Sequence, residues 1–216
     1  MEPTWFKLYP LLLEGTKITA QVAGLSAVLT LIISAAAGLC RVSGFAPVRA
    51  AAKVYVDFFR SSSLLVLLFW IYFALPFAGI ELPKLAAAVL AISLNCGAYG
   101  AEIVRSSILA VPKGQYEAAV ALNLNPTQTM WRVIFPQAFL RMLPPLGNLL
   151  IELLKSTSLI YFITMSDLTY EAMILRNNYY SWTPQIFLLL LVIYFILAAI
   201  VTTIVRLLER RFAAWR

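Results

Sequence analysis

Charged and amide side chains recur at helical spacing inside the apolar blocks of this sequence. Asn95, Tyr99 and Glu102 lie four and then three residues apart, so one face of a helix would carry all three. A later block places three further polar side chains at the same spacing: Asn148, Glu152 and Lys155. An intramembrane path lined by such groups could hold a zwitterionic solute, because an acid and a base would meet its opposite charges.

A purely structural role is the alternative for both sets. Glu152 could pair with Lys155, and Glu102 could pair with Arg105 near the water interface. The asparagines could serve as hydrogen-bonding contacts between helices. Arg60, near the start of another apolar block, is expected to anchor that block at the interface.

The sequence offers no set of residues for catalysis. It has no His, which removes the commonest metal ligand and general base, and it has no phosphate loop of the GxxxxGK[ST] type. Cys40 and Cys96 both lie in apolar blocks and are interpreted as small hydrophobic residues. We therefore expect no enzyme activity, no metal and no cofactor, and any energy for uphill transport must come from a partner or an ion gradient.

Composition indicates the elements that position these side chains. Of the 216 residues, 62% are hydrophobic and only 12% are charged, whereas a soluble domain is roughly a quarter charged. We expect one all-α, polytopic membrane domain over residues 1–216, with spans long enough to cross about 30 Å of hydrocarbon. The expected spans are about 18–39, 54–75, 85–108, 146–165 and 184–207, with a short interfacial helix over 1–15 and a loop over 166–183.

Residues 112–136 interrupt this apolar pattern with a predicted helix-turn-helix. A first short helix is expected over 115–122, with Glu117 in its first turn, where the helix dipole favours an anion. Asn123 lies in the turn that follows. A second helix is expected over 126–135 and is expected to end at Pro136.

The start of the second helix carries a capping signature. Asn125 is a good N-cap, Pro126 suits the first helical position, and Gln128 stands where a capping box has Glu or Gln. Such a polar, well-capped element between two apolar blocks is expected to face water and a partner.

The basic residues predict the orientation of the chain. Twelve of them fall on one side of the expected spans and four on the other, and Lys and Arg are enriched in cytoplasmic segments. The larger set is Arg41, Arg49, Lys53, Arg60, Arg105, Lys113, Arg132, Arg141, Arg206, Arg210, Arg211 and Arg216, and the smaller set is Lys7, Lys17, Lys84 and Arg176. The N-terminus is therefore expected outside, and residues 112–136 and the C-terminus in the cytoplasm. This bias also explains the net charge of +7 without nucleic acid.

Residues 117–136 resemble the EAA loop of ABC importer permeases. The matching positions are Glu117-Ala118-Ala119, then Val133 and Phe135 two residues apart, then Pro136. Asn123 stands where the family has Gly, and Asn is the next residue most at ease in a left-handed turn.

The resemblance extends over about residues 10–212 to the polar amino acid uptake branch of these permeases. The similar stretches include 64–76, 99–105, 111–121, 143–148 and 153–159. The chain departs from that branch at Arg60-Ser61-Ser62-Ser63, at Leu67 and at Lys155-Ser156-Thr157. The combination of 122–126, 150–155 and 166–169 is most similar to permeases for ectoine and hydroxyectoine.

The resemblance implies a type I ABC importer permease fold in a bacterial inner membrane. It implies a path for a polar amino acid or a zwitterionic compatible solute such as ectoine. The implied partners are two cytoplasmic ATPase subunits, a second permease subunit that is the same or homologous, an extracytoplasmic solute-binding protein and membrane lipid. The residues implied in coupling to the ATPase are Glu117, Ala118, Ala119, Asn123 and Pro136.

Two other classes remain as alternatives. The chain could be a stand-alone secondary transporter or channel, with residues 112–136 as a gate. A membrane-embedded enzyme is the third class, and it lacks a catalytic constellation in this sequence.

Overall fold

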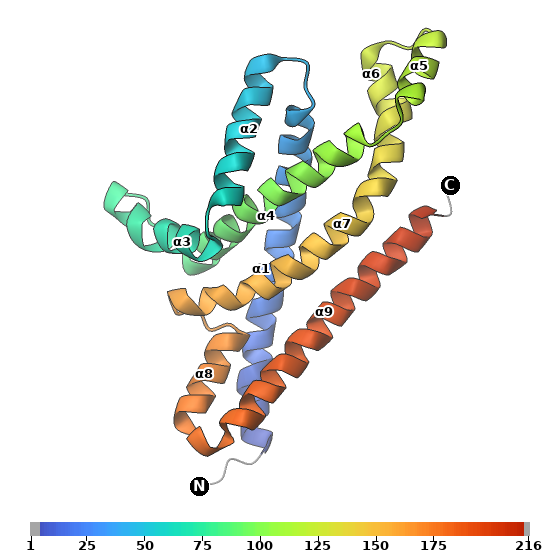
Figure 1. Ribbon diagram of the computed structural model, residues 1–216. Helices are drawn as coiled ribbons and strands as arrows, with labels where there is room; N and C mark the ends of the chain where they lie inside the picture. The colour runs from blue at the N-terminus through green and yellow to red at the C-terminus, as the bar shows by residue number, and fades with distance from the viewer. Residues whose placement is uncertain (1–4, 214–216) are drawn as a thin grey trace.

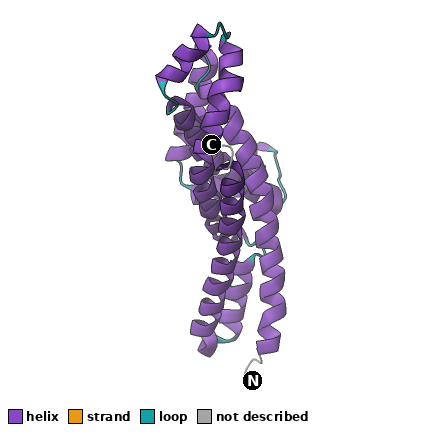
Figure 2. Cartoon of the chain, turned by 90° about the vertical axis from the view of Figure 1, so that its right-hand side faces the viewer, coloured by secondary structure: helices purple, strands orange, loops and turns teal. Residues whose placement is uncertain are grey.

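The computed structural model describes residues 5–213, and side chains over 10–211, as helices joined by short turns without any strand (Figures 1 and 2). This confirms the predicted all-α architecture. In chain order the elements are α1 (Trp5–Arg41), α2 (Ala46–Ser61), α3 (Leu64–Phe69), η1 (Trp70–Ala74), η2 (Leu75–Ala78), α4 (Lys84–Leu109), α5 (Lys113–Ala121), α6 (Pro126–Gln128), η3 (Thr129–Ile134), α7 (Phe135–Ser156), η4 (Thr157–Ile163), α8 (Leu168–Asn178), η5 (Tyr180–Trp182) and α9 (Thr183–Ala213).

Four helical stretches are long and apolar enough to cross a membrane, and a bent pair of helices would make a fifth span. The four are Pro10–Arg41, Lys84–Leu109, Pro126–Ile163 and Tyr180–Arg211. In the bent pair, Ala46–Ser61 and Leu64–Ala78 meet at 103°. Four to five candidate spans agree with the five that the sequence predicts.

The second predicted span, 54–75, is not one straight helix. Ser62 and Ser63 have extended backbone conformations, and we call this break between α2 and α3 the elbow. The Ser62 hydroxyl donates to the Phe58 carbonyl at 2.8 Å. Serine is a weak helix former because its hydroxyl competes locally for backbone groups, so a run of three serines is a natural place for a helix to end.

The N-terminal region and the 166–183 region are more helical than the sequence suggests. A single helix runs from Trp5 to Arg41 through Pro10, so no separate interfacial helix ends near residue 15. Residues 1–4, and the side chains of Trp5, Phe6 and Tyr9, lie outside the described part. The expected loop over 166–183 contains α8 and η5.

Pro136 does not end the helix that begins at Pro126. The backbone widens into a π-type turn over Thr129–Ile134, and the Phe135 N–H then bonds to the Met130 carbonyl, five residues back. A proline lacks the N–H and clashes with the carbonyl four residues back in an ordinary helix. The wide turn just before Pro136 accommodates both effects, and the helix continues to Ser156.

The core forms where α1 crosses α4 in close contact. A Cβ placed on Gly38 would lie 2.9 Å from the Ala101 carbonyl oxygen, so only glycine permits this approach. Buried side chains from α1, α3, α4, α7 and η4 form the main apolar cluster, which includes Val22, Leu68, Ile92 and Leu153. Small residues at such contacts are typical of helices that pack within a membrane.

The two ends of the molecule differ in what they carry. The end of α1, the start of α2 and the α5–α6 region lie at the upper end in Figure 1, and the C-terminal end of α9 lies in the upper half below them. The start of α1 and α8 lie at the lower end. Several of the basic residues that the charge argument assigns to one side, among them Arg41, Arg49 and Arg132, therefore lie toward one end of the structure.

Candidate functional site

Residues 112–136, which we call the tip, project beyond the other helices at the upper end (Figures 1 and 2). Asn123 has φ +59°, in the left-handed region. The Leu124 N–H donates to the Ala119 carbonyl at 3.0 Å, and the Asn123 N–H donates to the Val120 carbonyl at 2.9 Å. This is a Schellman motif, which confirms the predicted left-handed turn at Asn123.

The capping box of the second helix is also confirmed. The Asn125 Oδ1 accepts from the Gln128 N–H at 2.8 Å, and the Gln128 Oε1 accepts from the Asn125 N–H at 3.1 Å. The prediction for Glu117 is wrong, because α5 begins at Lys113, two residues earlier than expected, with Pro112 as its N-cap. Glu117 thus lies beyond the first turn, and its side chain is exposed.

Exposed apolar side chains gather at the C-terminal end of α5, although this helix lies outside the candidate spans. Val120 is 71% exposed and Leu122 is 75% exposed, and the exposed Ala118 and Glu117 lie beside them. Ala119 points inward and is buried. An apolar patch with an acid at its edge, on a segment that water would otherwise surround, is typical of a protein-binding surface.

Two side chains that sequence reasoning missed join α7 to the tip and to the end of α4. The Gln137 side chain donates to the Gln115 side chain at 3.0 Å. The Arg141 guanidinium donates to the Ala110 carbonyl at the end of α4. Neither bond could be foreseen, because its partners are more than 20 residues apart. The first bond joins α5 to α7, and the second joins α7 to the end of α4.

On α4, the polar stripe holds the broken end of α2. The Asn95 amide donates to the Phe59 carbonyl at 2.8 Å and to the Ser62 carbonyl at 3.3 Å, and Asn95 is buried. The Tyr99 hydroxyl donates to the Arg60 carbonyl at 3.1 Å. The last carbonyls of a helix lack internal partners, so these bonds satisfy groups that the elbow leaves free.

Arg60, which the sequence predicts to be an interfacial anchor, contacts the polar stripe of α4. Its guanidinium lies over the Tyr99 ring, 5.4 Å from the ring centre. A cation in this position is attracted to the face of the ring. Arg60 therefore belongs with the polar side chains of α4, although its side chain remains exposed.

Glu102 forms an ion-pair network near the upper end of α4. Its carboxylate accepts two hydrogen bonds from the Arg105 Nε at 3.0 and 3.1 Å, and it lies 3.5 Å from the Arg41 guanidinium on α1. This geometry favours a structural role for Glu102 and Arg105, as a pair that joins α4 to α1.

On α7, the polar stripe is exposed. Lys155 lies 2.8 Å from Glu152, and their side chains remain 61% and 67% exposed. Asn148, one turn earlier, is exposed as well. The predicted pair forms, yet this face of α7 packs against nothing in the described chain. An acid and a base on an apolar span must meet water or a partner, because lipid would leave their charges unsolvated.

Comparison with known proteins places these features in a family. Residues 29–214 match the model of the binding-protein-dependent transport system inner membrane component family. The chain belongs to this family. Its members are the membrane-embedded permease subunits of ABC importers, which are multi-pass, non-catalytic inner-membrane proteins.

Relatives in this family are similar over nearly the whole chain. A probable amino-acid ABC transporter permease protein of Sinorhizobium fredii is 42% identical over 94% of this chain and 87% of that protein. The glutamine transport system permease protein GlnP of Escherichia coli is 38% identical over 83% of this chain and 84% of that protein. A crystal structure of an amino acid ABC transporter with histidines superposes with a TM-score of 0.88 and 32% identity, covering 98% of this chain and 100% of that chain.

Proposed function

We propose that this permease subunit forms the translocation path for a polar amino acid or a zwitterionic compatible solute such as ectoine or hydroxyectoine. The exposed face of α7 carries the proposal, because Asn148, Glu152 and Lys155 offer an amide, an acid and a base on one apolar span. Relatives named for glutamine, arginine and L-cystine transport point to the same solute chemistry, an ammonium with a carboxylate. The ectoine assignment rests on residues 122–126, 150–155 and 166–169 alone.

In this proposal a second permease subunit, identical or homologous, covers the α7 face and leaves a polar passage between the two. Tyr99 and Glu102 of α4 would border that passage, and Asn95 would hold the elbow beside it. The N-terminus lies outside and the C-terminus in the cytoplasm, where the tip meets the ATPases. A solute-binding protein delivers the solute on the outer side.

The tip is proposed to couple ATP hydrolysis to transport. Its exposed Glu117, Ala118, Val120 and Leu122 present an apolar surface with one acid, which fits a groove with a basic residue on each ATPase subunit. Ala119 and the Asn123 turn hold α5 in shape, and Pro136 follows the wide turn that joins the tip to α7.

The solute assignment is tested by uptake into proteoliposomes that contain the whole transporter and its solute-binding protein. Ectoine, hydroxyectoine, glutamine and arginine are compared with and without ATP. ATP-dependent uptake of one of them supports the proposal. Uptake that persists without the ATPase subunits would instead identify a stand-alone transporter.

Lys155→Ala tests the proposed path. Transport is expected to fall by roughly tenfold, the loss expected when one charged contact worth about 1.4 kcal/mol is removed. The complex should still assemble, because Lys155 is exposed. Lys17→Ala, which removes an exposed lysine from α1, is the control. Transport that persists with unchanged affinity would leave Lys155 with a structural role only.

Glu117→Lys tests the coupling role of the tip. Uptake is expected to fall by about tenfold or more while ATP hydrolysis continues, since placing like charges together at an interface costs several kcal/mol. Glu81→Lys, the same charge reversal at an exposed site away from the tip, should leave uptake unchanged. Normal coupling in reconstituted vesicles would contradict the docking role of Glu117.

A further inference from the structure

A second polar feature lies at the upper end of the molecule, away from the tip and from the α7 face. It is a cavity of about 480 Å³ between the end of α1, the start of α2 and the last turns of α4. Its lining residues, which define the basic cavity, are Arg41, Ala46, Arg49, Ala50, Lys53 and Arg105. Four of these six residues are cations, so the cavity is suited to an anion.

The acids nearby do not neutralise these cations. Glu102 pairs with Arg105 and Arg41, and Asp57 lies 3.9 Å from Arg41. Two acids thus face four bases. The Nη1 of Arg41 is shielded from solvent and lies 3.9 Å from the Asp57 Oδ1, which is too far for a hydrogen bond. This donor can therefore still pair with an acceptor, such as a phosphate oxygen.

Arg49 and Lys53 are the cations that remain available. The Arg49 guanidinium donates to the Ser43 carbonyl at 3.0 Å, and this leaves most of its donors unused. No ion pair or hydrogen bond of the Lys53 ammonium is found within the described residues. Both side chains are exposed, on the first two turns of α2, where the helix dipole adds positive potential.

The height of the basic cavity matches the phosphate level of a membrane. Arg41 is the last residue of the first candidate span, and Arg105 lies one turn before the end of α4. Phospholipid phosphates occupy this boundary between hydrocarbon and water. Basic pockets between the ends of membrane helices are known to bind anionic headgroups.

An apolar surface leads from this cavity into the membrane along α2. Ala50 lines the basic cavity, and Val54 and Phe58 continue the same helical face at intervals of four residues. Val54 is 69% exposed and Phe58 is 61% exposed. The distance from Ala50 to Phe58 along the helix is about 12 Å, comparable to the roughly 15 Å of hydrocarbon in one leaflet.

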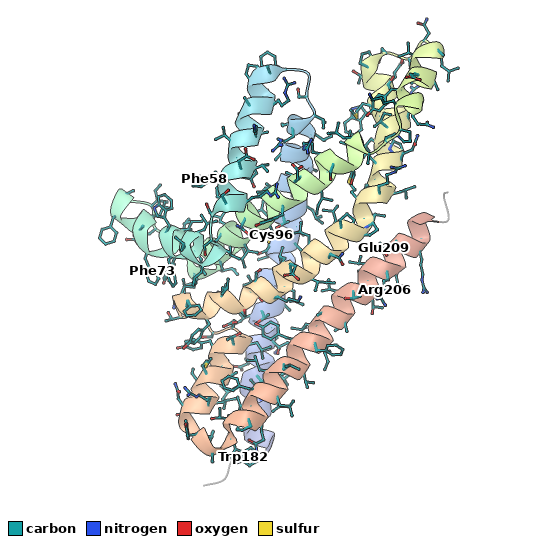
Figure 3. All side chains as sticks on the ribbon, viewed as in Figure 1. Phe58, Phe73, Cys96, Trp182, Arg206 and Glu209 are labelled. Atoms are coloured by element: carbon teal, nitrogen blue, oxygen red, sulfur yellow. The ribbon has the colours of Figure 1, made fainter. Side chains whose placement is uncertain are left out.

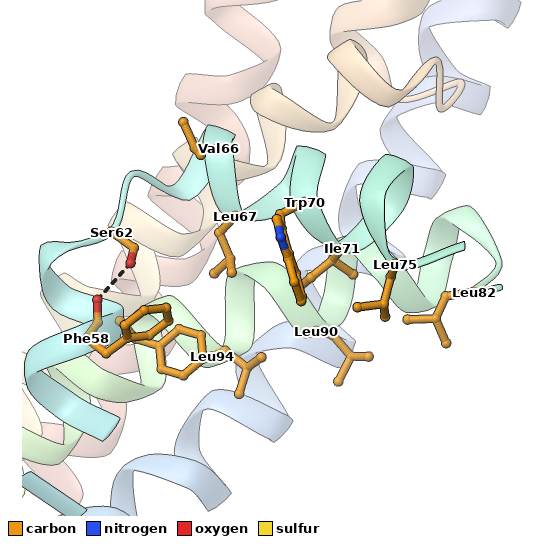
Figure 4. A pocket seen from close by; sticks show the side chains of 11 residues that line it. Phe58, Ser62, Val66, Leu67, Trp70, Ile71, Leu75, Leu82, Leu90 and Leu94 are labelled. Atoms are coloured by element: carbon orange, nitrogen blue, oxygen red, sulfur yellow. Dashed lines mark hydrogen bonds between the residues drawn. The ribbon is translucent and has the colours of Figure 1, made fainter. Parts of the chain in front are cut away.

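The apolar surface ends in a second cavity at the elbow. Phe58 is on its wall together with Val66, Leu67, Trp70 and Leu94, and its volume is about 490 Å³ (Figure 4). Almost all of the surface of this apolar cavity is nonpolar. A cationic cavity, an apolar strip and an apolar cavity thus follow one another along α2, in the order of a phospholipid's phosphate and acyl chain.

We propose that α2 binds one anionic phospholipid of the adjoining leaflet, with its phosphate in the basic cavity and an acyl chain along Val54 and Phe58 to the apolar cavity. The proposed orientation of the chain decides only which leaflet supplies the lipid. The lipid would support the elbow, which the Asn95 amide holds from the opposite side.

Bromine-labelled lipids test this arrangement, because bromine on an acyl chain quenches a tryptophan that it touches. The whole transporter is reconstituted with brominated phosphatidylglycerol or brominated phosphatidylcholine, and the quenching of Trp70 is taken as the difference from a Trp70→Phe transporter. The anionic lipid is expected to quench Trp70 at roughly tenfold lower mole fraction than the neutral one, as expected for two basic contacts. The double variant Arg49→Ala/Lys53→Ala is expected to remove that preference.

The matched control is Arg206→Ala/Arg210→Ala, which removes two exposed cations from α9, and Figure 3 shows Arg206 well apart from Phe58. The control should keep the preference for the anionic lipid. Equal quenching by the two lipids, or a preference that survives Arg49→Ala/Lys53→Ala, overturns the proposal.

A final arm distinguishes a lipid from a free anion. Inorganic phosphate at millimolar concentration should leave the quenching unchanged, and displacement of the lipid by phosphate would instead identify a site for a soluble anion. ATP-driven uptake is measured on the same samples. Uptake without a preference for the anionic lipid overturns the lipid-binding inference alone. A lipid preference without uptake supports lipid binding and contradicts the proposed transport function.

Discussion

Among the side chains that the structure describes outside the candidate spans, Asp167 carries the most deeply buried carboxyl group. It is the N-cap of α8, and its oxygens accept hydrogen bonds from the Thr169 N–H at 3.2 Å and the Tyr170 N–H at 3.0 Å. Burial raises the pKa of Asp167 to about 6, and these hydrogen bonds offset only part of that rise.

The stability of the lower end of the molecule, where α8 lies, should therefore depend on pH. Because the pKa of Asp167 is higher in the folded chain than its ordinary value of 3.8, its contribution is largest below about pH 4 and is lost as the pH rises through about 6. Asp167→Asn keeps an N-cap but stays neutral. The free energy of unfolding of this variant should exceed that of the natural chain by an amount that grows between these pH values to about 2–3 kcal/mol.

Thermal unfolding of the two transporters at pH 4 to 8 checks this prediction. Burial also raises the pKa of Glu171, so the difference between the two chains, rather than either curve, reports Asp167. A difference that does not change with pH would contradict the inferred titration.

At the scale of elements, the contact of α1 with α8 depends on the absence of a side chain. A Cβ on Gly15 would lie 2.8 Å from the Leu168 Cα and 2.9 Å from the Asp167 carbonyl oxygen. One turn along α1, the Thr19 hydroxyl accepts a hydrogen bond from the Leu168 N–H at 3.0 Å. The N-terminal half of α1 thus packs closely against the start of α8.

Gly15→Ala should destabilise the protein by about 1–3 kcal/mol, because the obstacle is backbone rather than a movable side chain. Gly24→Ala on the same helix is the control, since a Cβ there meets nothing within 4 Å. The Gly24→Ala variant should be as stable as the natural chain, or more stable by up to about 1 kcal/mol, because Ala favours a helix more than Gly does. Thermal unfolding distinguishes them, and equal stability of the two variants would refute the close contact.

At the scale of the whole molecule, the distribution of basic groups predicts which end faces the cytoplasm. In a background with Cys40→Ala and Cys96→Ala, single cysteines are introduced at Tyr180→Cys near the lower end and at Arg210→Cys near the upper end. Both positions are exposed. A membrane-impermeant maleimide should label position 180 in intact cells and position 210 only after the membrane is permeabilised. The reverse pattern would contradict the proposed orientation.

Several features were determined by the sequence itself, because they depend on neighbours within a few residues. The turn at Asn123 and the capping box of Asn125 and Gln128 form from backbone groups no more than five residues away. The apolar blocks are similarly local, since span length and hydropathy need no tertiary partner. The Glu152–Lys155 pair lies within one turn of one helix, and its formation was foreseeable on the same ground.

Only the tertiary structure decided what the polar stripes do. Their spacing is the same, yet Asn95 is buried against the end of α2 while Asn148 and Lys155 are exposed. Helical periodicity places side chains on a face but does not say which element that face meets, and this depends on packing between residues far apart in the chain. The serine run favours a helix end at the elbow, but the angle between α2 and α3 depends on packing. The basic cavity likewise requires groups from separate helices, and the continuation of the helix through Pro136 requires a backbone adjustment that local propensity alone does not predict.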